Sequence, residues 1–218
     1  MGTFVFKWNY LRGVIMTFIS EFPRPFPPTI SHAGSTFTGS NGLGTATAST
    51  LTLSIAAATA ATSWSDMPRI TKNLSYLDPW RLDAVAKLAS VSGHNANTFL
   101  PFALRDSSGN LLILIQSAGN NVVTIYDSSG LLANAGSIGA LDGTEWCRIV
   151  LRDSVSTIYR GVGSSGSQDW TPLWRGNVKI PASSSFNYTY LSFNLYQGSG
   201  AAGTVTAQWS DVYTTLLY

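Results

Sequence analysis

Charged side chains are scarce in this sequence, and glutamate is nearly absent. Charged residues make up 11% of the 218-residue chain, well below the roughly 25% of an average soluble domain. Glu21 and Glu145 are the only glutamates, so solubility must come from hydroxyls and amides, and the chain has 28 serines and 22 threonines. Serine and threonine suit strands and turns, whereas glutamate favours helices. The composition therefore predicts an all-β protein.

The few charges are scattered along the chain, and this limits the partners that we expect. The net charge is +2, and no basic stripe is present to neutralise phosphates, so we expect no nucleic-acid partner. Near the N-terminus, the longest uncharged stretch, residues 13–20, is too short to span a membrane. No small-residue cleavage site follows it. We therefore expect neither a signal peptide nor membrane insertion.

Cysteine and histidine are too few for an intrachain disulfide or a zinc site. Cys147 is the only cysteine, and its place in an apolar run beside Trp146 predicts a buried thiol. His32 and His94 have no further metal ligand at a suitable spacing. A secreted lectin would more often carry disulfides. Their absence fits a protein that folds in a reducing cytoplasm and is released later.

The chain divides into an N-terminal arm and one domain. Residues 1–20 are apolar and aromatic, and residues 21–33 hold four of the nine prolines, which predicts extended, polyproline-like chain. We therefore predict an extended arm over residues 1–33 and a single domain over residues 34–218. Because one domain cannot easily bury five arm aromatics, we expect them to contact neighbouring subunits. These residues are Trp8, Tyr10, Phe18, Phe22 and Phe26.

Alternating apolar residues predict strands throughout residues 34–218. Residues 50–55 have period two, with the apolar face at positions 51, 53 and 55. Residues 99–105 and 111–115 flank a five-residue turn that contains Gly109, which is a hairpin signal. The unbroken apolar run 111–115 predicts a strand buried on both faces. A second turn pairs Asp127 with Gly130, which is suited to a positive φ.

Two segments have less decisive patterns. Residues 56–61 fit a helical turn or a loop, and we favour the loop. Residues 83–90 are rich in alanine and leucine, as in a helix, but the preceding Trp80-Arg81-Leu82 favours a strand. With these choices, about ten strands separated by regular turns predict a two-sheet sandwich.

The order of these segments resembles a known family. The most specific part is Trp-Cys-Arg-Ile at residues 146–149, followed by residues 157–160 and by Trp-Thr-Pro-Leu at residues 170–173. It resembles the concanavalin A-like lectin/glucanase domain in its laminin G-like form, of the kind found in bacteriophage structural proteins. The turn at residues 163–169 is longer than the family's. Residues 210–213 resemble the family's last strand, which pairs near the first strand. The resemblance implies a two-sheet antiparallel jelly-roll sandwich.

The resemblance also implies recognition or assembly rather than catalysis. The first hypothesis is a non-enzymatic virion protein, a bacteriophage capsid decoration or tail or fibre component. It would fold in the host cytoplasm and be displayed on the virion surface. The arm would anchor it to other virion proteins or to copies of itself as an oligomer. The alternative is a carbohydrate-binding lectin module for host or environmental glycans.

A glycoside hydrolase is the least favoured hypothesis. The family's glucanases carry Glu-x-Asp-x-x-Glu, which places two carboxylates on one face of the cleft. A retaining glycosidase needs such a pair about 5–5.5 Å apart. With Glu21 and Glu145 as its only glutamates, the chain cannot supply this motif. We therefore assign no catalytic residues and expect no enzyme activity.

Tryptophans near loops are the candidates for stacking on a sugar. Trp80, Trp146 and Trp209 lie in strand patterns and are expected in the core. Tryptophans near loops would need polar neighbours that hydrogen-bond the hydroxyl groups of a sugar. The competing interpretation is that these tryptophans pack within the domain. The candidate glycan-binding residues are Trp64, Trp170, Trp174, His94 and Asn95.

Calcium is the one cofactor that the resemblance suggests. Relatives in this family often hold a calcium ion at the rim of the sandwich, and such a site needs oxygen ligands from several loops. The candidate ligands are Asp106, Asp127 and Asp153, with Asn120. Each is also explained by capping of a turn. We therefore expect no cofactor and no other metal.

Overall fold

The structure, a computed structural model, covers most of the predicted domain. It describes residues 29–40, 42–56, 66–74, 81–120, 122–137, 145–163, 168–182, 189–198 and 203–217. Among these residues there is no helix with the length and hydrophobicity of a transmembrane segment. Several predictions fall outside the described residues, namely those for Trp8, Tyr10, Phe18, Phe22, Phe26, Trp64, Trp80 and the loop at 57–61.

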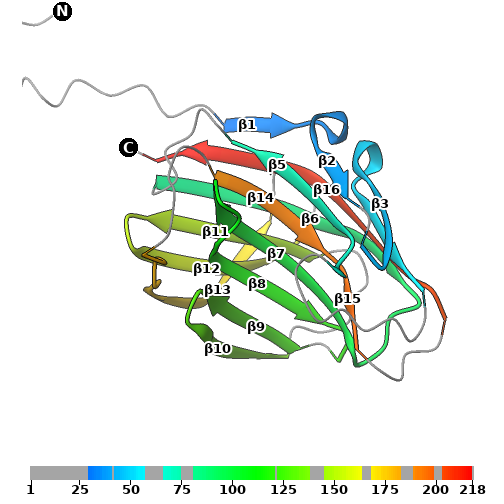
Figure 1. The fold of residues 1–218 in the computed structure, drawn as a ribbon. Helices are drawn as coiled ribbons and strands as arrows, with labels where there is room; N and C mark the ends of the chain where they lie inside the picture. Colours follow the sequence, from blue (N-terminus) through cyan, green and yellow to red (C-terminus); the bar gives the residue numbers. More distant parts are fainter. Residues whose placement is uncertain are drawn as a thin grey trace, which may run out of the picture.

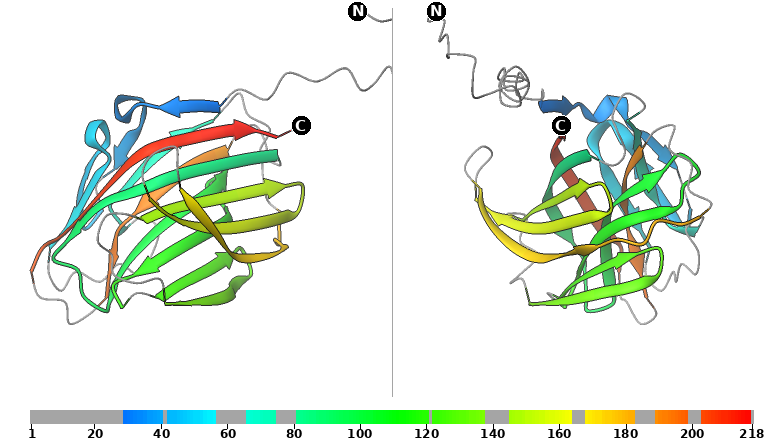
Figure 2. Two further views of the ribbon diagram at one scale, coloured as in Figure 1. Left: turned by 180° about the vertical axis from the view of Figure 1, so that it is seen from behind. Right: turned by 90° about the vertical axis from the view of Figure 1, so that its left-hand side faces the viewer.

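The described residues form two antiparallel sheets packed face to face (Figure 1). Sheet A contains β1 (Thr29–His32), β3 (Gly44–Thr47), β4 (Thr52–Ile55), β6 (Arg81–Ser92), β11 (Glu145–Arg152), β12 (Val155–Val162), β13 (Asp169–Asn177) and β16 (Val205–Leu216). Its order is β13-β12-β11-β6-β16-β4-β3, and β1 also pairs with β16. Figure 2 shows β16, β6 and β11 to β13 side by side from behind.

Sheet B forms the other layer of the sandwich. It contains β2 (Thr38–Ser40), β5 (Arg69–Asn73), β7 (Thr98–Asp106), β8 (Leu111–Ala118), β9 (Val122–Asp127), β10 (Gly130–Ser137), β14 (Thr189–Asn194) and β15 (Tyr196–Gln197). Its order is β10-β9-β8-β7-β14-β5-β2, and β15 pairs with β7. Two short 3₁₀ turns, η2 (Gly34–Thr36) and η3 (Ala48–Thr50), lie near the start of the domain. The predicted all-β, two-sheet jelly-roll sandwich is confirmed.

The segment with the ambiguous pattern, residues 83–90, lies within β6. This strand pairs with β11 on one side and β16 on the other, so its backbone groups are hydrogen-bonded along both edges. Leu82, Ala84, Ala86 and Leu88 are fully buried, and the residues between them face the opposite side of the sheet. The helix-like composition is therefore overridden by pairing with two neighbouring strands.

Both predicted hairpin turns form with the expected chemistry. Asp106 accepts two backbone hydrogen bonds within the β7–β8 turn, at 2.9 and 2.7 Å, and Gly109 has a φ of 84°. Asp127 accepts a backbone hydrogen bond of 2.7 Å within the β9–β10 turn, and Gly130 has a φ of 121°. The positive φ values are those that glycine adopts without a steric penalty.

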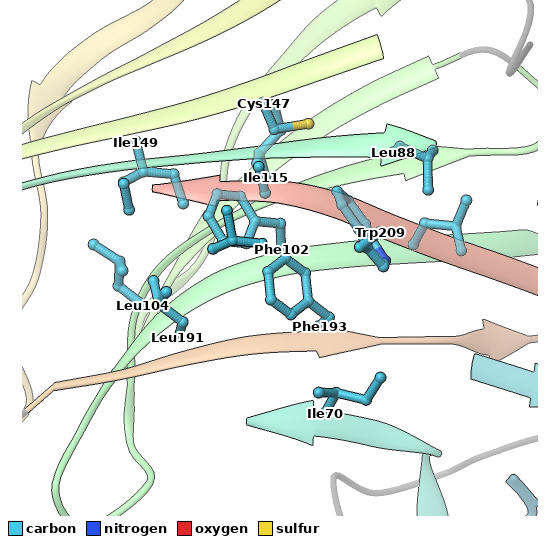
Figure 3. Packing of buried hydrophobic residues seen from close by; sticks show 14 of the residues in the cluster. Ile70, Leu88, Phe102, Leu104, Ile115, Cys147, Ile149, Leu191, Phe193 and Trp209 are labelled. Atoms are coloured by element: carbon cyan, nitrogen blue, oxygen red, sulfur yellow. The ribbon is translucent and has the colours of Figure 1, made fainter. Parts of the chain in front are cut away.

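Aromatic rings fill the centre of the space between the sheets (Figure 3). Phe102 and Phe193 stack with ring centroids 5.1 Å apart, and Trp209 lies 5.0 Å from Phe193. Cys147 lies in the same core, and burial raises the pKa of its thiol far above the ordinary value. The predicted burial of Cys147 and Trp209 is thus confirmed. The apolar run of β8 is also buried on both faces, as predicted.

The last residues of the predicted arm belong to the sandwich. Strand β1, which spans Thr29 to His32, pairs with residues 212–215 of β16. His32 is buried, and its Nε2 lies 2.7 Å from the hydroxyl of Thr214. Four residues of the predicted arm, Thr29 to His32, thus form an edge strand of sheet A. The pairing of the last strand with the first, implied by the family resemblance, is present.

Candidate functional site

The outer face of sheet A, over β11, β12 and β13, carries a surface of polar and aromatic side chains. On β11, Cys147, Ile149 and Leu151 point into the core. Since side chains alternate along a strand, Arg148 and Val150 point outward. The register places Tyr159 of β12 directly beside Arg148. The outward positions of three adjacent strands therefore form one surface.

An ion pair fixes Arg148 on this face. Its Nε donates to Oδ1 of Asp83 at 2.9 Å, and its Nη2 donates to Oδ2 at 2.6 Å. This bidentate arrangement is the strong, directional form of the arginine–carboxylate contact. The hydrogen bonds that Arg148 donates to Asp83 raise the pKa of Arg148 above its ordinary value. The guanidinium is consequently held in one orientation, and Asp83 has no oxygen without a partner.

Aromatic rings surround the same guanidinium. The central carbon of the Arg148 guanidinium lies 5.4 Å from the ring centroid of Tyr159 and 5.5 Å from that of Trp170. These distances are within the range of cation–π attraction. Gly161 of β12 lies opposite Trp170 of β13. A Cβ atom on Gly161 would approach the Trp170 ring to 3.0 Å. Glycine at this position thus lets the indole lie close against the sheet.

Trp146 is buried beneath this cluster rather than between the sheets. It is fully buried but is not part of the inter-sheet core. The ammonium of Lys87 lies 5.7 Å from its ring centroid, and its indole Nε1 donates to the carbonyl of Gly163 at 2.9 Å. The predicted burial of Trp146 is confirmed, but it takes place on the outer face of sheet A.

A shallow groove with a cavity volume of about 450 Å³ runs along this face. Its polar lining comes from all three strands, and Val150 and Val155 complete it. We call it the arginine groove, defined by Arg148, Arg152, Thr157, Tyr159 and Arg175. A second, smaller hollow of about 190 Å³ also includes Arg152 in its lining. The arginine groove offers guanidinium, hydroxyl and aromatic groups but no carboxylate among its described lining residues.

Two of the groove's three arginines have no acidic partner among the described residues. The described ion pairs are Arg148 with Asp83, Arg81 with Asp153, and Arg160 with Glu145. Arg152 and Arg175 are both exposed, and neither takes part in these pairs. The groove therefore carries positive charge that the described part of the chain does not neutralise.

The one described glutamate is placed away from this groove. Glu145 is buried, and its Oε1 accepts a hydrogen bond from Nη2 of Arg160 at 3.2 Å. Glu145 and Arg160 alternate with the outward residues of β11 and β12, so they lie toward the core side. The other buried carboxylate of sheet A, Asp83, is bound by Arg148. Neither carboxylate lines the groove.

The predicted glycan-binding residues are not brought together. Trp170 lies beside the arginine groove through Arg148, whereas Trp174 packs against the core. His94 and Asn95 lie in the loop between β6 and β7. The Asn95 side chain accepts a hydrogen bond of 2.8 Å from the amide of Asn97, so it serves the loop itself. Sequence reasoning missed Arg148, Tyr159 and Arg175, although the even spacing of Arg148, Val150 and Arg152 indicated a shared strand face.

The candidate calcium ligands all have other partners in the structure. Asp106 receives hydrogen bonds within its own turn on both carboxylate oxygens. Asp127 receives them from Ser129 and from the amide of Lys179, and although burial alone would raise its pKa, these bonds hold that pKa below its ordinary value. Asp153 pairs with Arg81 at 3.3 Å. The described residues contain no group of three metal-ligating side chains.

The outer face of sheet B has a different polar layer. Leu191 and Phe193 of β14 point into the core, so Ser192 and Asn194 face outward. Both are fully buried, and neither the hydroxyl nor the amide group has a hydrogen-bond partner among the described residues. On the neighbouring strand, burial lowers the pKa of Arg105 to about 10, and the nearby charge of Arg69 acts in the same direction.

Comparison with known proteins finds relatives in fold but not in sequence. No protein-family model and no curated protein matches the chain. A sialidase is 13% identical with a TM-score of 0.58, over 84% of this chain and 17% of the sialidase. The xylan beta-1,4-xylosidase from Bacillus halodurans C-125 is 9% identical with a TM-score of 0.55, over 88% of this chain and 40% of that one. The chain thus spans less than half of either enzyme.

A phage protein module matches over nearly its whole length. The CBM2 module of the evolved Dit protein of Lactobacillus casei BL23 phage J-1 is 13% identical with a TM-score of 0.52. The match covers 88% of this chain and 98% of the module. At such identities the likeness concerns the fold alone. The fold that they share is a two-sheet antiparallel β-sandwich.

Proposed function

We propose that this chain is a non-enzymatic carbohydrate-binding module and that the arginine groove is its binding site. The observation that carries the proposal is the Arg148 guanidinium, fixed by Asp83 and flanked by the rings of Tyr159 and Trp170 at the edge of a groove. A sugar presents both hydroxyl groups and apolar ring faces. Fixed hydrogen-bond donors beside aromatic surface complement these two features.

Binding without hydrolysis is the better match to the chemistry of this groove. Glycoside hydrolysis requires two carboxylates that flank the bond to be cleaved. The described lining supplies none, because Glu145 is buried with Arg160 and Asp83 is bound by Arg148. The structural relatives are consistent with a carbohydrate-related role, since their names are a sialidase, a xylosidase and a CBM2 module.

The test is glycan binding by the wild type and by two tyrosine variants. Tyr159→Ala removes a ring from the groove, whereas Tyr126→Ala removes a half-buried ring from β9 in sheet B and serves as the matched control. A glycan array followed by titration calorimetry should show binding that Tyr159→Ala weakens by about tenfold or more. Tyr126→Ala should leave it unchanged.

The assay is run with calcium and again with a chelator, and also on a panel of polysaccharides for turnover. Binding that is equal in both conditions is expected, because the calcium candidates are occupied by turn contacts. An array without any binder, or equal losses from both tyrosine variants, would contradict the proposed site. Release of new chain ends from any polysaccharide would contradict the non-enzymatic role.

A second candidate function is a structural role in a virion, in which the N-terminal arm attaches the domain to other proteins. It is favoured by the likeness to a phage Dit module that matches over 98% of its length. We propose that Trp8, Tyr10, Phe18, Phe22 and Phe26 attach the sandwich to virion proteins or to other copies of the chain on the virion surface. Both functions are compatible, because a displayed module can also bind glycans.

Deletion of residues 1–28 tests this role, because it removes these aromatics and leaves strand β1 in place. Light scattering should give an oligomeric mass for the full chain and a monomeric mass for the truncated one. Circular dichroism should show that the truncated protein keeps its β structure. Equal masses for the two forms would contradict self-association of the chain through the arm.

A further inference from the structure

We propose that the ligand of the arginine groove is an acidic glycan, one whose sugars carry carboxylate or sulfate groups. This inference rests on the proposed carbohydrate-binding function and adds the chemical class of the ligand. It depends on how charge is distributed around the groove. It does not depend on the fold, because the structural relatives share only 9 to 13% of their sequence with this chain.

The three arginines of the groove have separate roles. Arg148 is neutralised by Asp83, and its Nε and Nη2 are occupied, so it acts as a fixed donor through its remaining N–H groups. Arg152 and Arg175 are exposed and have no acidic partner among the described residues. Two uncompensated positive charges therefore remain in a groove without a lining carboxylate.

The positions of these two arginines suit a ligand with more than one anionic group. Arg152 lies on β11, and Arg175 lies on β13 opposite Thr157 of the intervening strand. Neighbouring strands are about 4.8 Å apart, so two strand spacings separate their backbones by roughly 10 Å across the sheet. A single anionic group would contact both guanidiniums only if the two arginine side chains leaned toward each other. Anionic groups repeated along a polysaccharide can contact each of them in turn.

An acidic glycan fits this surface better than a nucleic acid does. The whole chain has a net charge of only +2, so it lacks the extended basic surface that phosphate backbones require. Hydroxyl groups of a sugar, in contrast, can bond with Thr157 and Tyr159 along the groove floor.

The experiment compares one sugar backbone with and without charge. Oligogalacturonate and its fully methyl-esterified form are titrated into the full-length protein in the presence of a chelator, at two salt concentrations. Arg152→Gln and Arg175→Gln each remove a groove charge. Lys179→Gln removes an exposed charge beside the β9–β10 turn and is the matched control, because Lys179 does not line the groove.

We expect the charged oligomer to bind at least about tenfold more tightly than the esterified one, and more weakly at high salt. Each arginine variant should reduce that binding by about tenfold, and Lys179→Gln should not. If both oligomers bind equally and the arginine variants have no effect, the acidic class is wrong while carbohydrate binding stands. If no glycan of any charge binds, the proposed function itself fails. Equally tight binding of single-stranded DNA would overturn the assignment to glycans.

Discussion

The outer faces of the two sheets differ in how their polar side chains are hydrogen-bonded. On sheet A, Asp83 is bonded on both oxygens by Arg148, and the charges left over are exposed to solvent. On sheet B, Ser192 and Asn194 are fully buried without a hydrogen-bond partner among the described residues. A buried polar group without a partner costs about 1–3 kcal/mol. On these outer faces, sheet A thus pairs its buried carboxylate Asp83, whereas sheet B buries polar groups that no described residue bonds.

The largest effect should come from breaking the ion pair on sheet A. Arg148→Met leaves the mostly buried carboxylate of Asp83 without its partner, and we expect a loss of about 2–3 kcal/mol in the free energy of unfolding. Urea denaturation followed by tryptophan fluorescence measures this loss. The double variant Asp83→Asn/Arg148→Met should recover part of it, and Arg175→Met should change stability by less than about 0.5 kcal/mol. Equal losses from Arg148→Met and Arg175→Met would contradict the assigned role of the pair.

The next effect concerns His32, a buried histidine on β1, the strand that pairs with β16. Burial, with a contribution from the charge of Lys72, lowers the pKa of His32 from 6.5 to about 4. Between these two values the unfolded chain binds a proton that the folded chain does not, so stability falls as the pH falls. From pH 7.5 to pH 5 we expect a loss of about 2 kcal/mol.

Thermal or urea unfolding across this pH range measures the effect. In His32→Gln the loss between pH 7.5 and pH 5 should largely disappear, even if the variant is less stable throughout. An unchanged pH dependence in the variant would show that His32 does not cause it.

The smallest effect compares the same substitution on the two sheets. Ser192→Ala on sheet B removes a hydroxyl that has no partner, so we expect stability to rise by about 0.5–1 kcal/mol. Ser156→Ala on sheet A removes a hydroxyl that donates to the carbonyl of Val150 at 3.1 Å, so we expect a loss of about 1 kcal/mol. Urea denaturation of both variants tests the difference in sign. A loss in both variants would mean that the Ser192 hydroxyl has a partner in solution.

Much of the fold could be predicted because its signals are local. The alternation at residues 50–55 leads to β4, with Leu51, Leu53 and Ile55 buried as predicted. The β7–β8 and β9–β10 turns each contain an aspartate and a glycine. They form because the carboxylate accepts backbone hydrogen bonds within the turn and the glycine tolerates a positive φ. Strand β1 was missed because it follows a proline-rich segment and its polar residues have no apolar alternation.

The candidate site was less predictable than the fold. Trp170 was identified from its place near a loop, and it does lie beside the arginine groove. Trp174 was identified for the same reason but packs on the core, because a register shift between Ile158 and Tyr159 changes which residues of β13 face inward. A single irregularity of this kind exchanges the two faces of a strand, and sequence alternation alone does not reveal it.

The all-β class, most of the strands, the hairpin turns and the burial of Cys147 could all be predicted from local sequence patterns. These features depend on backbone preferences and on contacts within a few residues. The tertiary structure alone decided that Asp83 would meet Arg148, 65 residues away, and that His32 would meet Thr214, 182 residues away. It also decided that three arginines on two strands would share one groove. Strand order and register set these contacts, and both arise from packing the whole sandwich around one core.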